Sequence, residues 1–195
     1  KWSWGFDHDT GDAYEFFLNL GPLVNAEEKY FKAKQPYWAL NVENSSYSEV
    51  WRSRSIWRYL GGVRPAVLTV GGWFDSEDPQ GPLRMFEFME KNSPPATNVL
   101  VMGPWTHGGF ARGDGDHVGN VTFGSKTSEF YRKQIEFPFF QHFLKGSGDG
   151  KFPKAWAFET GTNQWRRFES WPPRQAKAQP LYLSAGGRLT RDSDS

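Results

Sequence analysis

AVLTVGGWFD at residues 66–75 and NVLVMGPWTH at residues 98–107 are two apolar, β-rich runs, each ending at glycine and leading to an ionisable residue. Such near-continuous apolar runs are typical of strands that are covered on both faces. Between them, Asp78 and Pro79 favour the start of a helix that ends near Lys91, because aspartate caps helices and proline suits the first turn. The order strand–helix–strand predicts an α/β fold with two parallel strands joined by a right-handed crossover.

Asp75 and His107 follow the ends of these two predicted strands. Neighbouring parallel strands bring the loops at their carboxyl ends together, and chemistry in open α/β sheets collects there. A carboxylate can hold the Nδ1–H of an imidazole and leave Nε2 free to act as a base. A turn or loop role would explain either residue alone, so the pair carries the prediction: they lie close together as the acid and base of a triad.

The third member of such a triad would be a serine in a Gly-x-Ser-x-Gly turn, and the sequence contains no such pattern. Gly146-Ser147-Gly148 follows the histidine in a linker-like segment, and Gly124-Ser125 lacks the second glycine. Two interpretations stay open. Either the triad hypothesis is wrong, or the nucleophile lies in a preceding part of the polypeptide.

The 195 residues carry 23 basic and 22 acidic side chains, so the net charge is close to zero. This balance argues against a nucleic-acid partner, because there is no basic excess to neutralise phosphates. Cysteine is absent, which excludes disulfides and thiolate metal sites but does not fix the compartment. No apolar run approaches the ~18 residues of a membrane span. Aromatic residues make up 17% of the chain and predict a packed aromatic interior, a few members of which could line a pocket.

The first sixty residues predict short helices separated by loops. Asp9 or Thr10 is expected to cap the first of these helices. Ser46 and Glu49 have the spacing of a capping box, so a helix is predicted from there to Leu60, preceded by a polar loop.

Beyond the histidine, a glycine-rich loop leads to a long aromatic helix at residues 127–144, which Pro138 should kink. Residues 145–150 have the composition of a linker. Residues 154–160 then alternate with period two, which predicts the start of a separate antiparallel β domain.

Two acidic clusters resemble fragments of cation sites. Residues 7–9 (Asp-His-Asp) with Asp12 carry carboxylate and imidazole groups, and residues 114–117 (Asp-Gly-Asp-His) match the first part of a calcium loop. The second cluster lacks the third acid and the distant glutamate of that loop. Solvated loops explain both clusters better, so we predict no metal site and no cofactor.

Residues 71–75 (Gly-Gly-Trp-Phe-Asp) and 103–108 (Gly-Pro-Trp-Thr-His-Gly), in this order and at this spacing, resemble the acid and histidine motifs of the cocaine esterase-like acyl hydrolases. That group includes X-Pro dipeptidyl-peptidases, glutaryl acylases and α-amino acid ester hydrolases. Further segments that resemble the family are Val50-Trp51-Arg52, Phe139-Phe140, Leu144-Lys145-Gly146, Gly161-Thr162-Asn163-Gln164-Trp165, Trp171-Pro172-Pro173 and Leu181-Tyr182-Leu183-Ser184.

The resemblance implies an α/β-hydrolase core, a helical cap inserted between nucleophile and acid, and a C-terminal β-sandwich of the jelly-roll type. Residues 1–60 would then be a cap segment and the approach to the acid strand. Residues 61–146 would be the C-terminal part of the core, and residues 151–195 the incomplete start of the jelly roll. Asp75 would be the triad acid and His107 the general base. The serine and the oxyanion hole would come from a missing N-terminal part of the same polypeptide.

The resemblance also implies a small-molecule ester, amide or short-peptide substrate. In the α-amino acid ester hydrolases, carboxylates bind the substrate ammonium, and Glu77 and Glu49 are the candidates for that role in this chain, although a surface or capping role explains each as well. The resemblance suggests a periplasmic or secreted protein. It allows a homo-oligomer and does not decide between that and a monomer.

A non-enzymatic interpretation is the alternative, in which the chain is an aromatic-rich binding or scaffold module. The distance from the Asp75 carboxylate to the His107 ring separates the two hypotheses. Hydrogen-bonding reach supports the hydrolase, whereas a separation well over ~6 Å argues against it. A part of a hydrolase should also expose an unpaired strand edge, which a complete module should not.

Overall fold

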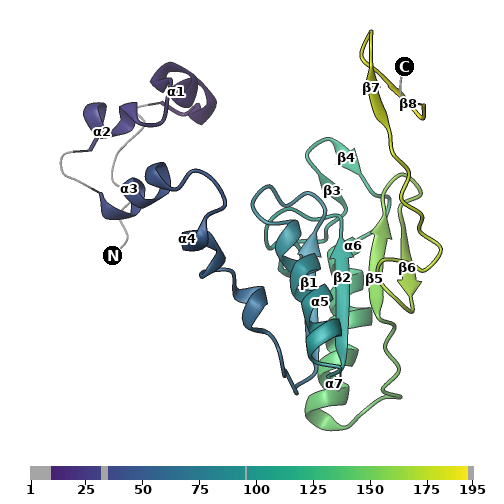
Figure 1. Ribbon diagram of the computed structural model, residues 1–195. Coiled ribbons are helices and arrows are strands. Elements are labelled where there is room, and N and C mark those ends of the chain that lie inside the picture. The colour runs from purple at the N-terminus through teal and green to yellow at the C-terminus, as the bar shows by residue number, and fades with distance from the viewer. Residues whose placement is uncertain (1–9, 32–34, 95, 193–195) are drawn as a thin grey trace. The chain divides into compact units, whose positions relative to one another are not determined.

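The computed structural model describes residues 10–31, 35–94 and 96–192 (Figure 1). The chain divides into two compact units, residues 1–55 and residues 56–195. The cation site considered at residues 7–9 lies outside the described residues.

The first unit is helical, as expected for the start of the chain. Its first helix begins at Asp12, whose Oδ1 accepts the backbone N–H groups of Tyr14 (2.9 Å) and Glu15 (3.2 Å). The prediction that Asp9 or Thr10 would cap this helix is therefore wrong, because Asp12 satisfies the free N–H groups of the first turn. The helices of this unit are α1 (Ala13–Leu20), α2 (Asn25–Lys29), α3 (Pro36–Glu43) and α4 (Glu49–Arg52).

The single helix predicted from Ser46 to Leu60 is also wrong. Helix α4 has only one turn, its N-cap is Ser48, and a separate 3-10 turn, η1 (Ile56–Tyr59), opens the second unit. The hydroxyl groups of Ser53 and Ser55 donate to backbone carbonyls of the preceding turn, at 3.2 and 3.0 Å. Such local side-chain hydrogen bonds compete with continuation of a helix, which explains why α4 ends early.

The second unit contains a four-stranded sheet in the order β1-β2-β5-β6, with β1 at one edge. The strands are β1 (Val67–Gly72), β2 (Asn98–Gly103), β5 (Ala155–Glu159) and β6 (Gln164–Phe168). The predicted parallel pairing of the first two strands is confirmed, with Val67 opposite Asn98 and Gly72 opposite Gly103. This register brings the two strands to an end at the same level. On the outer side of β1, no strand within the described residues is paired with it.

Helices cover both faces of this sheet. Figure 1 shows α5 (Gln80–Asn92) on one side and α6 (Thr127–Tyr131) with α7 (Phe137–Lys145) on the other. Alternate residues of β2 enter two separate clusters: Leu100 and Met102 pack with Phe86 of α5, whereas Val99 and Val101 pack with residues of α6 and the turn after it. A strand that is buried on both faces needs apolar residues at every position, which is the pattern seen in the sequence.

The predicted start of a separate β domain at residue 151 is wrong for the first two strands of that segment. Strand β5 pairs in parallel with β2, and β6 pairs antiparallel with β5, so both belong to the central sheet. The alternation in β5 is one of small and large apolar residues rather than of buried and exposed ones. Ala155 faces the cluster beside α5, and Trp156 faces the cluster beside α6 and α7.

The long aromatic helix is present and departs from α-helical geometry just before Pro138. Residues 132–136 form a single π-helical turn, η3 (Arg132–Glu136), and α7 begins directly after it with Pro138 in its first turn. The backbone N–H of Phe137 donates to the carbonyl of Arg132, the i→i+5 bond that defines a π-helix.

Short elements complete the second unit. They are the 3-10 turn η2 (Gly109–Ala111), the hairpin of β3 (His117–Val118) and β4 (Val121–Thr122), and the hairpin of β7 (Tyr182–Ser184) and β8 (Arg188–Thr190). Within the described residues, no helix has the length and apolar character needed to cross a bilayer.

The end of β1 lies unusually close to the loop that follows β2. A Cβ atom built on Gly72 would come within 2.2 Å of the backbone oxygen of Trp105. Likewise, a Cβ atom on Gly103 would meet the Trp105 ring at 2.4 Å. Only glycine allows these approaches, since the obstacles are backbone atoms and a large buried ring.

We expect Gly72→Ala to lower the free energy of unfolding by about 1–3 kcal/mol, because the added methyl must push the two loops apart. Urea unfolding followed by tryptophan fluorescence measures the change. Gly61→Ala is the matched control, because its Cβ atom would lie 3.8 Å from the nearest atom, an ordinary contact. Equal stability of the two variants would contradict the steric argument.

Candidate active site

The loops that follow β1 and β2 are tied together beyond the ends of the strands. The backbone N–H of Trp73 donates to the carbonyl of Gly103 at 2.8 Å, and that of Phe74 donates to the carbonyl of Trp105 at 3.1 Å. The parallel pairing thus extends into the two loops. It brings the acid loop and the histidine loop side by side, as the sequence predicted.

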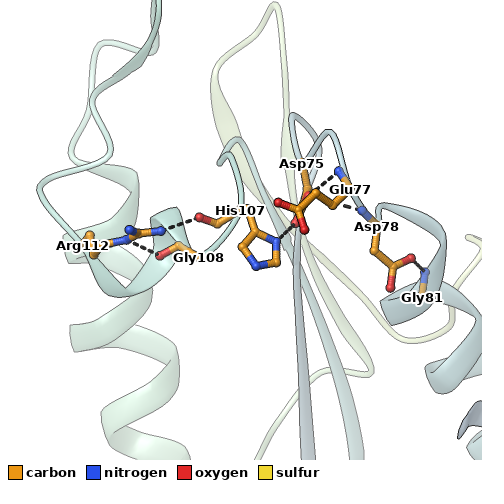
Figure 2. Close-up of polar contacts among 7 residues, drawn as sticks. All are labelled: Asp75, Glu77, Asp78, Gly81, His107, Gly108 and Arg112. Carbon is orange, nitrogen blue, oxygen red and sulfur yellow. Dashed lines mark hydrogen bonds and ion pairs between the residues drawn. The ribbon is translucent and has the colours of Figure 1, made fainter. Parts of the chain in front are cut away.

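Asp75 uses its two carboxylate oxygens for different partners (Figure 2). Oδ1 accepts the backbone N–H groups of Glu77 (2.8 Å) and Asp78 (3.3 Å), while Oδ2 lies 3.0 Å from Nδ1 of His107. The Asp75 side chain is only 12% exposed, whereas that of His107 is 64% exposed. The carboxylate is therefore fixed in a turn, and the imidazole contacts it from the solvent-exposed side.

The contact defines what each ring nitrogen of His107 can do. A carboxylate oxygen can only accept, so Nδ1 carries the proton in this contact and donates it to Asp75. The neutral ring then has an unprotonated Nε2, which points away from Asp75 in Figure 2. A base held in this tautomer by an acid is the arrangement that activates a hydroxyl nucleophile.

The surroundings of Asp75 favour its ionised form. The backbone hydrogen bond from Glu77 lowers the pKa of the Asp75 carboxyl most. Desolvation is the next-largest cause and raises the pKa, and the N–H of Asp78 and the His107 side chain lower it further. Asp75 therefore keeps its negative charge at neutral pH and can stabilise an imidazolium on His107.

Asp78 makes a similar hydrogen bond to the backbone that follows it. Its Oδ1 accepts the N–H of Gly81 at 2.6 Å, at the start of α5 (Figure 2). A Cβ atom on Gly81 would clash with that carboxylate. The turn that holds the acid is thus continuous with the N-terminus of α5.

The contact that anchors the histidine loop, between Trp105 and Thr127, was not predicted from the sequence. The buried indole of Trp105 donates to Thr127 Oγ1 at 2.9 Å, and Thr127 in turn donates to the carbonyl of Gly115. The Trp105 ring also packs edge-on against Tyr131 and Phe110. No local signal marks this contact, since 22 residues separate Trp105 from Thr127.

The two candidates for binding a substrate ammonium differ in position. Glu77 is exposed two residues after the acid, and its backbone N–H, rather than its side chain, contacts Asp75. Glu49 is exposed in the first turn of α4, in the other compact unit. Their roles as ligands stay predictions.

The acidic residues at 114–117 are engaged with side chains of the protein itself. Asp114 forms an ion pair with Lys126 at 3.0 Å, and Asp116 lies 2.6 Å from Nδ1 of His117. No group of three or more His, Asp or Glu side chains among residues 10–31, 35–94 and 96–192 could hold a metal ion.

A groove of about 470 Å³ lies on the β5–β6 side of the sheet, and its lining includes neither Asp75 nor His107. The indole of Trp73 donates to the carbonyl of Phe158 at 3.0 Å at this groove. The lining residues are Trp73, Ala157, Phe158, Glu159, Thr160, Arg166, Phe168 and Trp171.

A mainly parallel sheet between helices, with an aspartate and a histidine paired at the carboxyl ends of its parallel strands, is the framework of the serine-type α/β hydrolases. Residues 4–109 match the model of the X-Pro dipeptidyl-peptidase (S15) family, which is more than half of the chain. The chain belongs to this family, whose members are serine acyl hydrolases acting as esterases or peptidases.

Individual relatives agree with this membership. Over 189 residues the chain is 26% identical to the cocaine esterase of Rhodococcus sp. (strain MB1 Bresler), covering 92% of the chain and 32% of the esterase. It is 28% identical over 148 residues to a putative serine esterase of Mycobacterium tuberculosis (strain CDC 1551 / Oshkosh), covering 70% of the chain and 20% of that protein.

Solved structures show the same similarity. An aminopeptidase from a marine sediment archaeon, Thaumarchaeota archaeon, superposes with a TM-score of 0.82 at 27% identity, covering 94% of this chain and 30% of that one. An α-amino acid ester hydrolase superposes with a TM-score of 0.81 at 28% identity, covering 93% and 31%. The chain thus spans about a third or less of the length of these relatives.

The lowered pKa of Asp75 should survive removal of the histidine. We expect carbon-13 NMR titration to give Asp75 a pKa below 3.8 in the parent chain and in His107→Ala, because the N–H of Glu77 is the largest cause. Folding favours the ionised carboxylate, so its contribution to stability is complete above pH 3.8 and is lost as the pH falls through the lowered value.

Glu87 provides the internal control for that titration. Its pKa is lowered by the hydrogen bond and charge of Lys91 in α5, and it should be the same in both proteins. A return of Asp75 to its ordinary pKa in His107→Ala would show that the imidazole, and not the backbone, holds the acid.

Proposed function

We propose that this chain supplies the acid and the base of a serine acyl hydrolase that cleaves ester or amide bonds. The observation that supports this most directly is the 3.0 Å contact between Asp75 Oδ2 and His107 Nδ1 at the carboxyl edge of two parallel strands. The substrate is a small ester, an amide or a short peptide.

In the proposed reaction, Nε2 of His107 removes the proton of the serine hydroxyl as its oxygen attacks the scissile carbonyl. Asp75 stabilises the imidazolium that forms. The imidazolium then gives its proton to the leaving alcohol or amine, and an acyl-enzyme remains. Water, deprotonated by His107, attacks the acyl-enzyme and releases the acid product together with the restored serine.

The nucleophile and the oxyanion hole belong to a preceding part of the same polypeptide. Two observations support this: the sequence has no Gly-x-Ser-x-Gly turn, and the relatives are about three to five times as long as the matched region. The open outer side of β1 gives further sheet a place to pair. This 195-residue chain alone is then catalytically inactive.

The proposed domain arrangement follows the family with one change. Residues 1–60 form part of the cap and the approach to the acid strand, and the hydrolase core begins at residue 61. Because β5 and β6 belong to the central sheet, the core extends past residue 146 to Phe168. The hairpin of β7 and β8 opens the C-terminal β-sandwich.

The alternative of an aromatic-rich binding module has less support. It requires large aromatic side chains on a binding surface, and while Trp73 and Trp171 do line the groove, Trp105 and Trp156 are buried in the core beside Tyr131. The abundance of aromatic residues is accounted for, in this region, by packing on one face of the sheet.

Hydrolase activity should depend on Asp75 and His107, and it should be found only in the longer polypeptide that includes the preceding part with the nucleophile. We expect that polypeptide to hydrolyse p-nitrophenyl acetate, and Asp75→Asn or His107→Ala to lower kcat by about 10⁴-fold. Glu87→Gln, an exposed change in α5, should leave kcat near the parent value. A fluorophosphonate should label a serine outside these 195 residues. Turnover by the 195-residue chain alone, abolished by His107→Ala, would contradict the proposal.

If Glu77 helps to bind a substrate ammonium, Glu77→Gln should raise KM for an α-amino acid ester about 3- to 10-fold. The same ester without its amino group should show an unchanged KM. Glutamine keeps the backbone N–H that Asp75 accepts, so kcat should stay constant. Parallel increases in KM for both esters would argue against an ammonium contact. Glu49→Gln tests the second candidate in the same way.

A further inference from the structure

The Arg112 side chain hydrogen-bonds to the backbone of His107. Its Nη2 donates to the carbonyl oxygen of His107 at 2.6 Å, and its Nε lies 3.5 Å from the carbonyl oxygen of Gly108 (Figure 2). The guanidinium thus contacts two successive carbonyls, the first of them strongly. Among the described residues, Arg112 has no carboxylate partner within ion-pair distance.

The carbonyls that follow are held in the same manner by α6 and the π-helical turn. Ser128 donates to the carbonyl of Gly109 at 3.0 Å. Arg132 donates to the carbonyls of Phe110 and Gly113, at 3.0 and 2.8 Å. The histidine loop is therefore fixed by side-chain donors along its length, and Arg112 is the donor that reaches the histidine.

The local backbone is shaped to admit this contact. Gly108 has a left-handed conformation, with φ +67°, and a Cβ atom there would lie 2.9 Å from Nη2 of Arg112. Residues 109–111 then form the 3-10 turn η2, which brings Arg112 back over the carbonyl of His107. A charged donor makes a stronger hydrogen bond to a carbonyl than a neutral one does.

We infer that Arg112 is a positioning residue for the base, an inference that rests on the proposed function of His107. By holding the peptide plane between His107 and Gly108, the guanidinium fixes the direction in which the exposed imidazole leaves the backbone. Among the described residues, the Asp75 carboxylate is the one hydrogen-bond partner of the ring, so a change in that direction acts directly on the Nδ1–H···Oδ2 bond. A catalytic side chain needs neighbours that fix its position, because a small displacement from the reactive geometry lowers the reaction rate strongly.

The inference can be tested on the 195-residue chain by nitrogen-15 and proton NMR of the imidazole. In the parent chain we expect a downfield Nδ1–H proton and the Nδ1–H tautomer. In Arg112→Ala, exchange of this proton with water should accelerate about tenfold or more, and the tautomer preference should weaken. Arg112→Lys, which keeps one charged donor, should restore part of the protection.

Two further variants make the test specific. Arg84→Ala removes another exposed arginine, from α5, and should leave the imidazole signals unchanged. Arg132→Met removes a guanidinium from the same loop but from carbonyls other than that of His107, and its effect should be clearly smaller. Unchanged backbone amide spectra for β1 and β2 show that each variant is folded.

The outcomes separate this inference from the proposed function. An Nδ1–H signal that is present in the parent chain and unchanged in Arg112→Ala overturns the positioning role alone. An equal loss of Nδ1–H protection in Arg132→Met also overturns the positioning role, since the effect would then come from a general disturbance of the loop. Absence of the bonded Nδ1–H in the parent chain would instead remove the basis of the acid–base pair.

Discussion

The close approach of two backbones, at Gly72 and at Trp105, is the constraint on which the candidate site depends. The carbonyl of Trp105 occupies the space that any side chain at residue 72 would need, and the same carbonyl accepts the N–H of Phe74. Because Trp105 is fixed in turn by its indole bond to Thr127, the loops of the acid and the histidine share one anchor in the core. The distance between Asp75 and His107 is thus set by packing beneath them.

The two members of the pair are held by different means. The acid is fixed by backbone N–H groups of its own turn, which also account for most of its lowered pKa. The base is fixed through its backbone, and its ring is left open on the Nε2 side. A rigid aspartate beside an accessible imidazole suits the proposed role of His107, which is to exchange protons with a nucleophile, a leaving group and water.

The sequence was most informative where burial and strand order constrain it. The apolar residues of β2 predict a strand covered on both faces, and the order of strand, helix and strand predicts that Asp75 meets His107. The sequence was less informative where partners are distant or the pattern is ambiguous. The alternation in β5 fits an edge strand as well as a central one, and the Trp105–Thr127 bond has no local signature.

The π-helical turn before α7 contains one residue more than an α-helical turn would. In a regular α-helix each residue rotates the side-chain direction by roughly 100°, so Tyr131 and Phe139, eight positions apart, would diverge by roughly 80°. The extra residue offsets roughly 100° of rotation, so the directions of these two side chains in the same core cluster differ by roughly 20°. A homologue that is one residue shorter between them could therefore keep this buried face with an uninterrupted α-helix. Single-residue gaps at 132–136 in an alignment would mark a change of helix type and not a loss of the core.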